Sequence, residues 1–212
     1  MRITVTLARQ LGCGGSSLGR LLAENLQIRC LDREIVSQTA QQLALDEEEL
    51  AQREERVSSF WERMLRGITV STPEAPYVPQ PPPTVTDRDL FTAETEVMKT
   101  IAAQEDCVIV GRVASHVVPA HAGLVNIFLY APLDFRAQRV MERERLADLS
   151  QARALIARSD DTRKKFIAQM TGREWGDAKN YDLCLDTSSL PLPEIADFVT
   201  DYIRRRIAQA GG

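Results

Sequence analysis

The sequence predicts an α/β protein built on a doubly wound, five-stranded parallel sheet. The first observation is the order of residues 1–34, in which a short apolar run, a glycine-rich turn, an amphipathic helix and a second short strand follow one another. The second is a pair of continuous apolar runs at 107–110 and 125–130, as expected of strands buried on both faces of a sheet. The third is that helical patterns separate the expected strands, which favours parallel crossover connections.

The expected elements alternate along the chain. Strands are predicted from their apolar runs at residues 3–7, 28–31, 107–110, 125–130 and 181–185. Helices are predicted from their periodicity at residues 18–26, 35–43, 46–66, 86–104, 134–145, 150–171 and 193–208. Asp46 and Glu49 have capping-box spacing at the start of the third of these helices. Residues 71–85 hold five prolines between 76 and 83, which predicts an extended loop.

Length and composition favour one globular domain over residues 1–212. A chain of 212 residues can bury a full core, and an apolar fraction of 44% is ordinary for a folded protein. The formal net charge of -4 argues against a nucleic acid or an anionic membrane as a dedicated partner. No apolar run approaches the ~18 residues of a membrane helix, and the N-terminus lacks the pattern of a secretion signal. We expect a cytoplasmic protein.

Four scattered cysteines favour the same compartment. Cys13, Cys30, Cys107 and Cys184 lack the short spacing of a zinc site, and a chain of this size needs no disulfide, so we expect reduced thiols. Cys13 differs from the others because it precedes a helix N-terminus, where a thiolate is favoured. The simpler interpretation is that a small residue was needed there.

Candidate functional residues are expected where the strands end. Ligands of doubly wound sheets bind beyond the carboxyl ends of the strands. The segments that follow those ends are 9–17, 32–34, 111–116, 132–136 and 186–189.

The segment after the first strand has the composition of a phosphate-binding loop. Gly12, Gly14 and Gly15 let the backbone approach a phosphate and turn several N–H groups towards it. The following helix N-terminus adds roughly half a positive charge. Laid on the pattern G-x-x-x-x-G-K-[S/T], Gly15 takes the lysine position. Ser16, or Ser17 in a variant with one extra residue, takes the hydroxyl position that holds magnesium.

Two other interpretations of this loop stay open. A tight strand-to-helix turn would need the same glycines without any ligand. A dinucleotide-binding loop would need glycine where the chain has Ser17, although Asp32 stands where a ribose-binding acid would.

A basic segment occupies residues 153–173 in a chain that is acidic as a whole. It holds six arginines and lysines against Asp160 and Asp161. Arg158 and Arg163 are five residues apart, and the acids between them can hold their side chains in place. Arginine forks suit phosphate oxygens and can stabilise charge on a transferring phosphoryl group. A solvated helix with i,i+4 ion pairs would have the same composition.

Arg112 is a further candidate because it follows Gly111 directly after the buried run 107–110. At the carboxyl end of a parallel strand its side chain is expected to enter the ligand crevice and to grip the phosphate of an acceptor. A surface ion pair is the alternative.

Together these segments resemble a known family. The matching stretches are Ile3-Thr-Val-Thr-Leu-Ala-Arg-Gln-Leu-Gly-Cys-Gly-Gly, Leu31-Asp-Arg-Glu-Ile, Val108-Ile-Val-Gly-Arg, Arg158-x-Asp-x-x-Arg163 and Asn180-Tyr-Asp-Leu-Cys-Leu-Asp-Thr-Ser-Ser-Leu190. They are similar to the cytidylate kinase-like proteins, a branch of the P-loop nucleoside monophosphate kinase fold. The resemblance leaves out an insertion at 46–90, where cytidylate kinases place their monophosphate-binding part, and implies a helical lid at 146–176.

The resemblance implies ATP and Mg2+ as cofactors and a nucleotide or another small molecule as acceptor. The residues that would bind the ATP phosphates are Gly12, Cys13, Gly14, Gly15, Ser16 and Ser17, and Ser17 would also hold Mg2+. Those that would bind the acceptor are Asp32, Arg33 and Arg112. The catalytic residues of the lid motif would be Arg158, Asp161 and Arg163.

Two departures from the pattern of cytidylate kinases bear on activity. Gly15 stands where they have the loop lysine, and Val110 and Val113 replace the aspartates that flank the acceptor arginine. Loss of the lysine contact would cost ~3 kcal/mol, about two orders of magnitude in rate. Arg9, at the carboxyl end of the first strand, is the candidate replacement.

Three functions are consistent with the sequence. The first is an ATP-dependent phosphotransferase that works by positioning and electrostatics. The second is a nucleotide-binding regulator without catalysis, suggested by the missing lysine and aspartates. The third is a dinucleotide-binding protein, in which the basic segment 153–173 would have no role.

Overall fold

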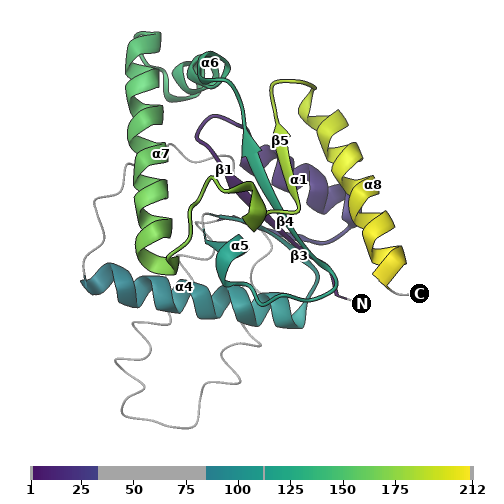
Figure 1. Ribbon diagram of the computed structural model, residues 1–212. Helices are drawn as coiled ribbons and strands as arrows, with labels where there is room; N and C mark the ends of the chain where they lie inside the picture. Colours follow the sequence, from purple (N-terminus) through teal and green to yellow (C-terminus); the bar gives the residue numbers. More distant parts are fainter. Residues whose placement is uncertain (1, 33–84, 112, 211–212) are drawn as a thin grey trace.

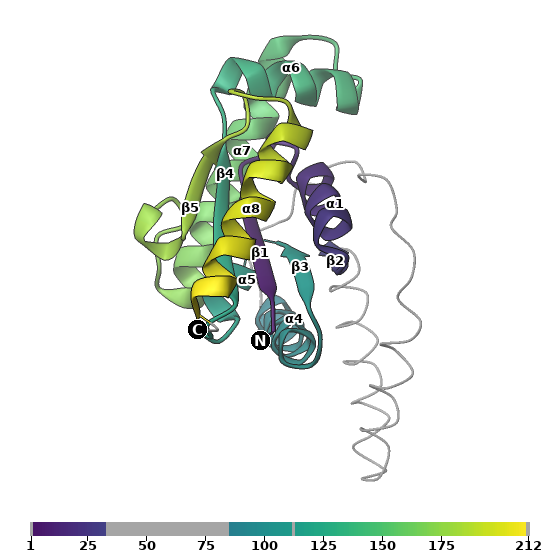
Figure 2. The same ribbon diagram turned by 90° about the vertical axis from the view of Figure 1, so that its right-hand side faces the viewer.

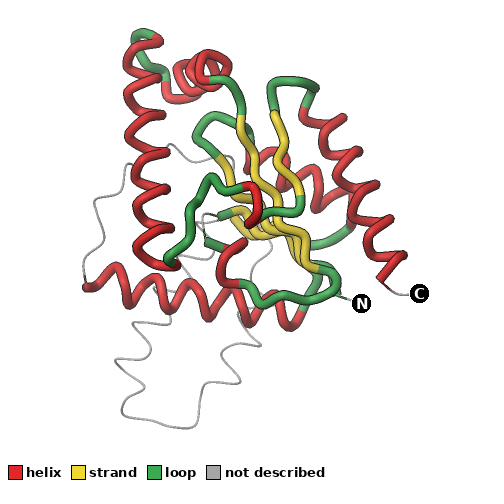
Figure 3. The backbone as a smooth tube through the Cα atoms, in the orientation of Figure 1, coloured by secondary structure: helices red, strands yellow, loops and turns green. Residues whose placement is uncertain are grey.

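The computed structural model describes residues 2–32, 85–111 and 113–210. Their centre is a sheet of five parallel strands in the order β2-β3-β1-β4-β5. Figure 3 shows the strands in the middle of the molecule with helices around them. The strands are β1 (Thr4–Arg9), β2 (Arg29–Asp32), β3 (Cys107–Val110), β4 (Leu124–Tyr130) and β5 (Leu183–Asp186). The prediction of a five-stranded parallel sheet is confirmed.

The strand β1 ends two residues later than its apolar run predicts. It pairs with β4 as far as Arg9, which lies opposite Leu129. Val5 and Leu7 are fully buried, as expected for a central strand. Backbone pairing thus continues beyond the apolar pattern, and it carries the Arg9 side chain to the carboxyl edge of the sheet.

Helices cover both faces of the sheet, as Figures 1 and 2 show. On one face, α1 (Gly15–Leu26) and α8 (Leu192–Ala210) bury an aliphatic core against β1, β3 and β4. On the other face, α4 (Val85–Gln104), α5 (Ala114–Val117) and α7 (Leu149–Thr171) enclose a core that contains Phe128 and Trp175. The sheet is therefore doubly wound, as predicted.

The helix α6 (Leu133–Glu144) and the first half of α7 stand at the carboxyl edge of the sheet (Figure 1). They share a small apolar core with the loop after β1. Its buried members are Leu11, Ala137, Val140, Ala152 and Ile156. This core joins α6 and α7 to the segment that the sequence predicts to bind phosphate.

Some predictions lie outside the described residues. They are the helices at 35–43 and 46–66, the proline-rich segment up to residue 84, and the site residues Arg33 and Arg112. The short helix α5 and the single turn η1 (Ala178–Asn180) were not predicted, because elements of three or four residues carry no periodic signal. In the described ranges, we find no helix with the length and apolar character needed to span a membrane.

Candidate functional site

The loop between β1 and α1 forms the centre of the candidate site. Its backbone turns through Gly12 at φ +89° and Gly14 at φ +73°, a left-handed region that favours glycine. The first helical hydrogen bond of α1 runs from the Leu18 N–H to the Gly14 carbonyl, at 3.0 Å. The N–H groups of residues 15–17 precede that bond, and within α1 neither a capping side chain nor an acid of the first turn compensates them. The positive end of the α1 dipole is thus left uncapped beside the loop.

The helix α6 packs directly on these glycines. A Cβ atom on Gly12 would lie 2.9 Å from the carbonyl oxygen of Arg136, and one on Gly14 would lie 2.7 Å from Nη2 of Arg139. The Cδ1 atom of Leu192, at the start of α8, is 2.9 Å from the second position. The loop is therefore enclosed between α6 and α8, with two arginines of α6 beside it.

The Arg9 side chain lies across the beginning of α1. A Cβ atom on Gly15 would be 2.5 Å from Cδ of Arg9 and 2.9 Å from its Cγ. The guanidinium continues to Asp32 at the end of β2, where Nη2 and Oδ1 are 3.4 Å apart. Since β3 separates β1 from β2 in the sheet, the side chain reaches from one strand end to another. Only 16% of the Arg9 side chain is exposed.

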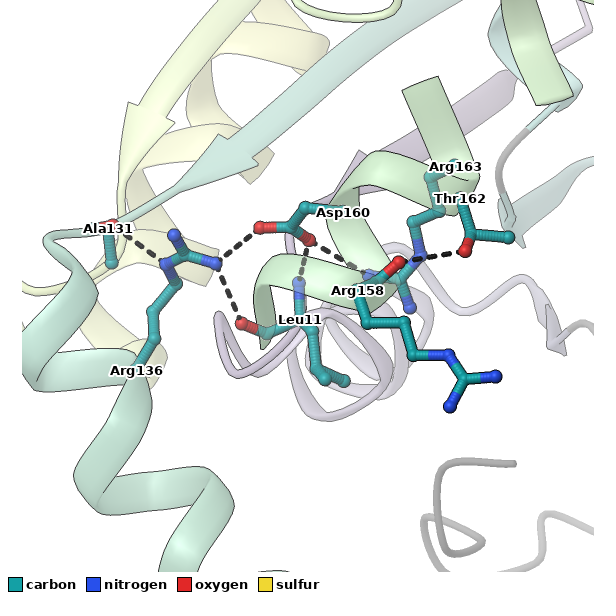
Figure 4. A network of polar contacts seen from close by, with 7 residues as sticks. All are labelled: Leu11, Ala131, Arg136, Arg158, Asp160, Thr162 and Arg163. Carbon is teal, nitrogen blue, oxygen red and sulfur yellow. Dashed lines mark hydrogen bonds and ion pairs between the residues drawn. The ribbon is translucent and has the colours of Figure 1, made fainter. Parts of the chain in front are cut away.

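A second network ties the loop to α6 and α7 (Figure 4). Nη1 of Arg136 lies 2.6 Å from Oδ2 of Asp160 and also donates to the Leu11 carbonyl, at 3.2 Å. The other carboxylate oxygen of Asp160 accepts the Leu11 N–H at 3.0 Å. Nε of Arg136 donates to the Ala131 carbonyl at 2.9 Å. The Arg136 side chain is 8% exposed, so this charge is buried and held by an opposite charge and two carbonyls.

Of the two predicted lid arginines, the structure brings one into this network. Nη1 of Arg163 lies 3.4 Å from Oδ1 of Asp160, and the Arg163 side chain is largely buried. Arg158 is exposed, and in Figure 4 its guanidinium points away from Asp160. Its backbone carbonyl accepts the Thr162 hydroxyl at 2.8 Å. Arg163 is therefore the lid arginine that lies with the loop.

Asp160, and not Asp161, makes the contact between α7 and the loop. Asp161 is exposed and pairs with Lys165 one turn further along, at 2.7 Å. The catalytic role predicted for Asp161 stays a prediction, and no contact of Asp161 with the loop supports it. Helical spacing is the signal that could have pointed to Asp160, because Asp160 is three residues before Arg163 and lies on the same face of α7.

Two arginines of α6 were also missed by the sequence prediction. Arg136 and Arg139 lie in a helix whose other charged residues give it the composition of a solvated surface helix. The one usable signal is position, because the segment 132–136 follows the carboxyl end of β4. Burial of Arg136 depends on contacts with Leu11 and Asp160, which are distant in sequence.

Cys13 is fully buried in the loop. Burial raises the pKa of its thiol to about 11, against the opposing effect of Arg136. The expectation of a favoured thiolate at the helix N-terminus is therefore wrong, and the simpler interpretation, a small residue in a tight turn, agrees with the packing.

A cavity of about 820 Å³ opens beside the loop, between α7 and the carboxyl ends of β4 and β5. Phe128 and Trp175 contribute to its apolar wall, and Gln10, Arg136 and Asp160 connect it to the loop. Its size falls within the usual range of small-molecule pockets, about 300–1,000 Å³.

Comparison with known proteins identifies the family. The model of the cytidylate kinase-like family matches residues 4–189. The chain belongs to the cytidylate kinase-like family. In this family member, the matched span runs from β1 through β5 and includes the loop, Arg136, Asp160 and Arg163.

One curated relative of this cytidylate kinase-like chain is a cytidylate kinase from Sulfolobus acidocaldarius. The two are 27% identical over 113 residues, which make up 53% of this chain and 61% of that protein. The match therefore spans less than two thirds of the relative's length.

Solved structures agree on the fold. A crystal structure of an uncharacterized protein from Eubacterium ventriosum ATCC 27560 has 21% identity and a TM-score of 0.69, and the comparison covers 96% of this chain and 99% of that one. A gluconokinase from Sinorhizobium meliloti 1021 has 16% identity and a TM-score of 0.52, with coverage of 97% and 94%. At such identities these likenesses concern the fold alone, which is the predicted doubly wound α/β fold.

Proposed function

We propose that this member of the cytidylate kinase-like family is an ATP-dependent phosphotransferase. It transfers the γ-phosphoryl group to a nucleoside monophosphate or another small acceptor. The observation that carries the proposal is the uncapped N-terminus of α1, beside which Arg9, Arg136 and Arg139 contact the same loop. Cations around an open helix N-terminus favour the binding of a polyphosphate.

The described residues supply positioning and charge stabilisation. The N–H groups of residues 15–17 and the loop glycines bind and orient the donor phosphates. Arg163, which Asp160 holds in place at 3.4 Å, stabilises the charge on the transferring phosphoryl group. An acceptor that is already a phosphate needs no dedicated base. Residues 146–176, which include α7, act as the lid.

The donor set beside the loop fits Mg2+. The hydroxyls of Ser16 and Ser17 are hard oxygen ligands, which Mg2+ takes together with water and phosphate oxygens. Ser17 is half-buried on the first turn of α1, where Nη2 of Arg20 lies 3.4 Å from its hydroxyl. Ser17 would hold the ion. A bound Mg2+ would neutralise charge on the phosphates.

The acceptor side of the proposal rests on Asp32, Arg33 and Arg112. Of these, Asp32 lies at the carboxyl end of β2, beside Arg9. Because a curated relative is a cytidylate kinase, CMP is the first acceptor to test.

A second candidate function is a nucleotide-binding regulator without catalysis. Gly15 in the lysine position and Val110 and Val113 beside Arg112 favour it. It predicts binding of ATP without transfer to any acceptor.

A transfer assay with γ-labelled ATP distinguishes the two functions. The acceptors are CMP, dCMP, UMP, AMP and a panel of small hydroxyl compounds, and the variants are Arg163→Ala and Lys165→Ala. We expect transfer by the wild type, a loss of about 100-fold in Arg163→Ala, and full activity in Lys165→Ala, which changes an exposed residue of the same helix. ATP binding with no transfer would support the regulator, and neither binding nor transfer would contradict both functions.

A further inference from the structure

Arg9 and a side chain at position 15 would need the same space. A Cβ atom on Gly15 would lie 2.5 Å from Cδ, 2.9 Å from Cγ and 3.0 Å from Nε of Arg9. Carbon atoms that are not bonded approach to about 3.5–4.0 Å at their optimal separation, so no side chain fits at position 15 while Arg9 keeps this conformation. The volume beside the first turn of α1, where a phosphate-binding loop places the stem of its lysine, is occupied here by an arginine that comes from β1.

The Arg9 side chain is fixed rather than free in solvent. It is 16% exposed, and its guanidinium lies 3.4 Å from the carboxylate of Asp32. A guanidinium carries five N–H donors, and the contact with Asp32 that the described residues show engages one N–H of Nη2. A long, loosely paired contact of this kind leaves an arginine able to bind a phosphate oxygen as well.

The surroundings keep the Arg9 charge at the loop. β1 carries Arg9 to the carboxyl edge, and β2 brings Asp32 to the same edge with β3 between them. The Arg9 stem passes over Gly15 before the guanidinium reaches Asp32. The positive charge is therefore positioned by two strands and not by the loop itself.

We propose that Arg9 replaces the missing loop lysine: its guanidinium binds the terminal phosphates of the nucleotide, and Asp32 is a positioning residue that holds Arg9 over α1. This inference rests on the proposed phosphotransferase function. The proposal explains why position 15 is glycine, since a lysine there would displace Arg9, which takes over the role of the loop lysine.

A reciprocal exchange tests the inference. The variants are Arg9→Ala, Gly15→Lys and the double variant, and Arg29→Ala serves as control because Arg29 pairs with Glu105 at 2.9 Å at the other end of β2. The measurements are ATP binding by calorimetry, the transfer rate, and the melting temperature of the unliganded protein. The melting temperature is measured without nucleotide, so it reports on the overlap of side chains even if the protein binds no ATP.

Arg9→Ala is expected to keep the melting temperature and to lose about 100-fold in transfer. Gly15→Lys is expected to lower both the melting temperature and ATP binding, because the new side chain overlaps Arg9. The double variant is expected to regain the melting temperature and to exceed Arg9→Ala about tenfold in transfer, because the lysine then has room. Arg29→Ala should match the wild type in ATP binding and in transfer.

The inference is overturned if Arg9→Ala binds and turns over ATP like the wild type, or if a folded double variant is no better than Arg9→Ala. Should the double variant not fold, Arg9→Lys and Arg9→Gln decide, since a cation must outperform the neutral amide about tenfold and equal rates contradict the proposal.

A double-mutant cycle tests the role of Asp32. If Asp32 acts on the nucleotide by holding Arg9, Asp32→Asn weakens ATP binding in the wild-type background and has little effect on ATP binding in the Arg9→Ala background. Additive effects would instead give Asp32 a role independent of Arg9 and remove that part of the inference.

If the wild type neither binds ATP nor transfers phosphate, the proposed function and this inference fail together. If the wild type is active and Arg9→Ala equals it, the inference alone fails.

Discussion

Nη1 of Arg136 lies 2.6 Å from Oδ2 of Asp160, and this ion pair joins α6, α7 and the glycine-rich loop at one point. Asp160 binds the Leu11 N–H on one oxygen and Arg136 on the other, while Arg136 also binds the Leu11 carbonyl. A movement of α7 therefore acts directly on the loop. The same carboxylate holds Arg163, so the shape of the loop and the position of the lid arginine depend on one side chain.

Removing Asp160 is expected to destabilise the protein. Asp160→Ala leaves the buried Arg136 charge without its carboxylate and the Leu11 N–H without its acceptor, which should lower the free energy of unfolding by roughly 3 kcal/mol. Urea unfolding followed by circular dichroism measures the change. Asp161→Ala is the matched control, because that carboxylate is exposed and its ion pair with Lys165 should contribute less than about 1 kcal/mol. Equal losses in the two variants would contradict the assignment of the central contact to Asp160.

The two lid arginines are expected to differ in their effect on transfer. Arg163 lies with Asp160 beside the loop, whereas Arg158 is exposed and directed away from Asp160 (Figure 4). Arg163→Ala should lower the transfer rate about 100-fold, and Arg158→Ala should lower it less. Steady-state kinetics of the two variants compares them. A larger loss in Arg158→Ala would show that α7 must rearrange before transfer.

Gly12 should not tolerate a side chain. Gly12→Ala combines a φ of +89° with a Cβ atom placed 2.9 Å from the backbone carbonyl oxygen of Arg136, so we expect a loss of stability above the ~1–2 kcal/mol of left-handed strain alone. Gly172→Ala isolates that strain, since Gly172 has a φ of +68° and open space at its Cβ position. Thermal unfolding of both variants separates crowding from strain. Equal melting temperatures would mean that α6 moves away from the loop at no cost.

The cysteines should react in the order of their exposure. Burial raises the pKa of Cys13 to about 11 and that of Cys107 to about 12, so both stay protonated thiols well above neutral pH. Cys184 is exposed. Alkylation by iodoacetamide at pH 8, mapped by mass spectrometry, should modify Cys184 first and should reach Cys13 at a comparable rate only in denaturant. Rapid labelling of Cys13 in the native protein would contradict its burial in the loop.

The sheet could be predicted because its central strands carry their own signal. Continuous apolar runs such as 107–110 mark strands that are buried on both faces, and the glycine turn marks the loop. The absence of lysine at Gly15 was equally visible. Arg9 could be named as the candidate replacement from its place at the end of the first strand, but its overlap with position 15 could not be predicted, because it depends on how far β1 pairs with β4.

The polar network was largely beyond prediction. Asp160 and Asp161 are neighbours of identical chemistry, and only the packing of α7 on the loop distinguishes the one that faces Arg136. Arg136 itself is buried by Leu11 and Asp160, which lie more than 20 residues away on either side in the sequence. Contacts of that separation leave no periodic signal, so the buried arginine could not be told from a solvated one.

Calorimetric titration of the wild-type protein with ATP and Mg2+ tests the central claim most directly. The uncapped N-terminus of α1 and the arginines around it predict saturable one-site binding in the micromolar range, weakened in Arg9→Ala and unchanged in Arg29→Ala. Absence of heat at millimolar ATP would mean that the loop is a tight turn without a phosphate ligand, and it would contradict the assignment of this site to nucleotide binding.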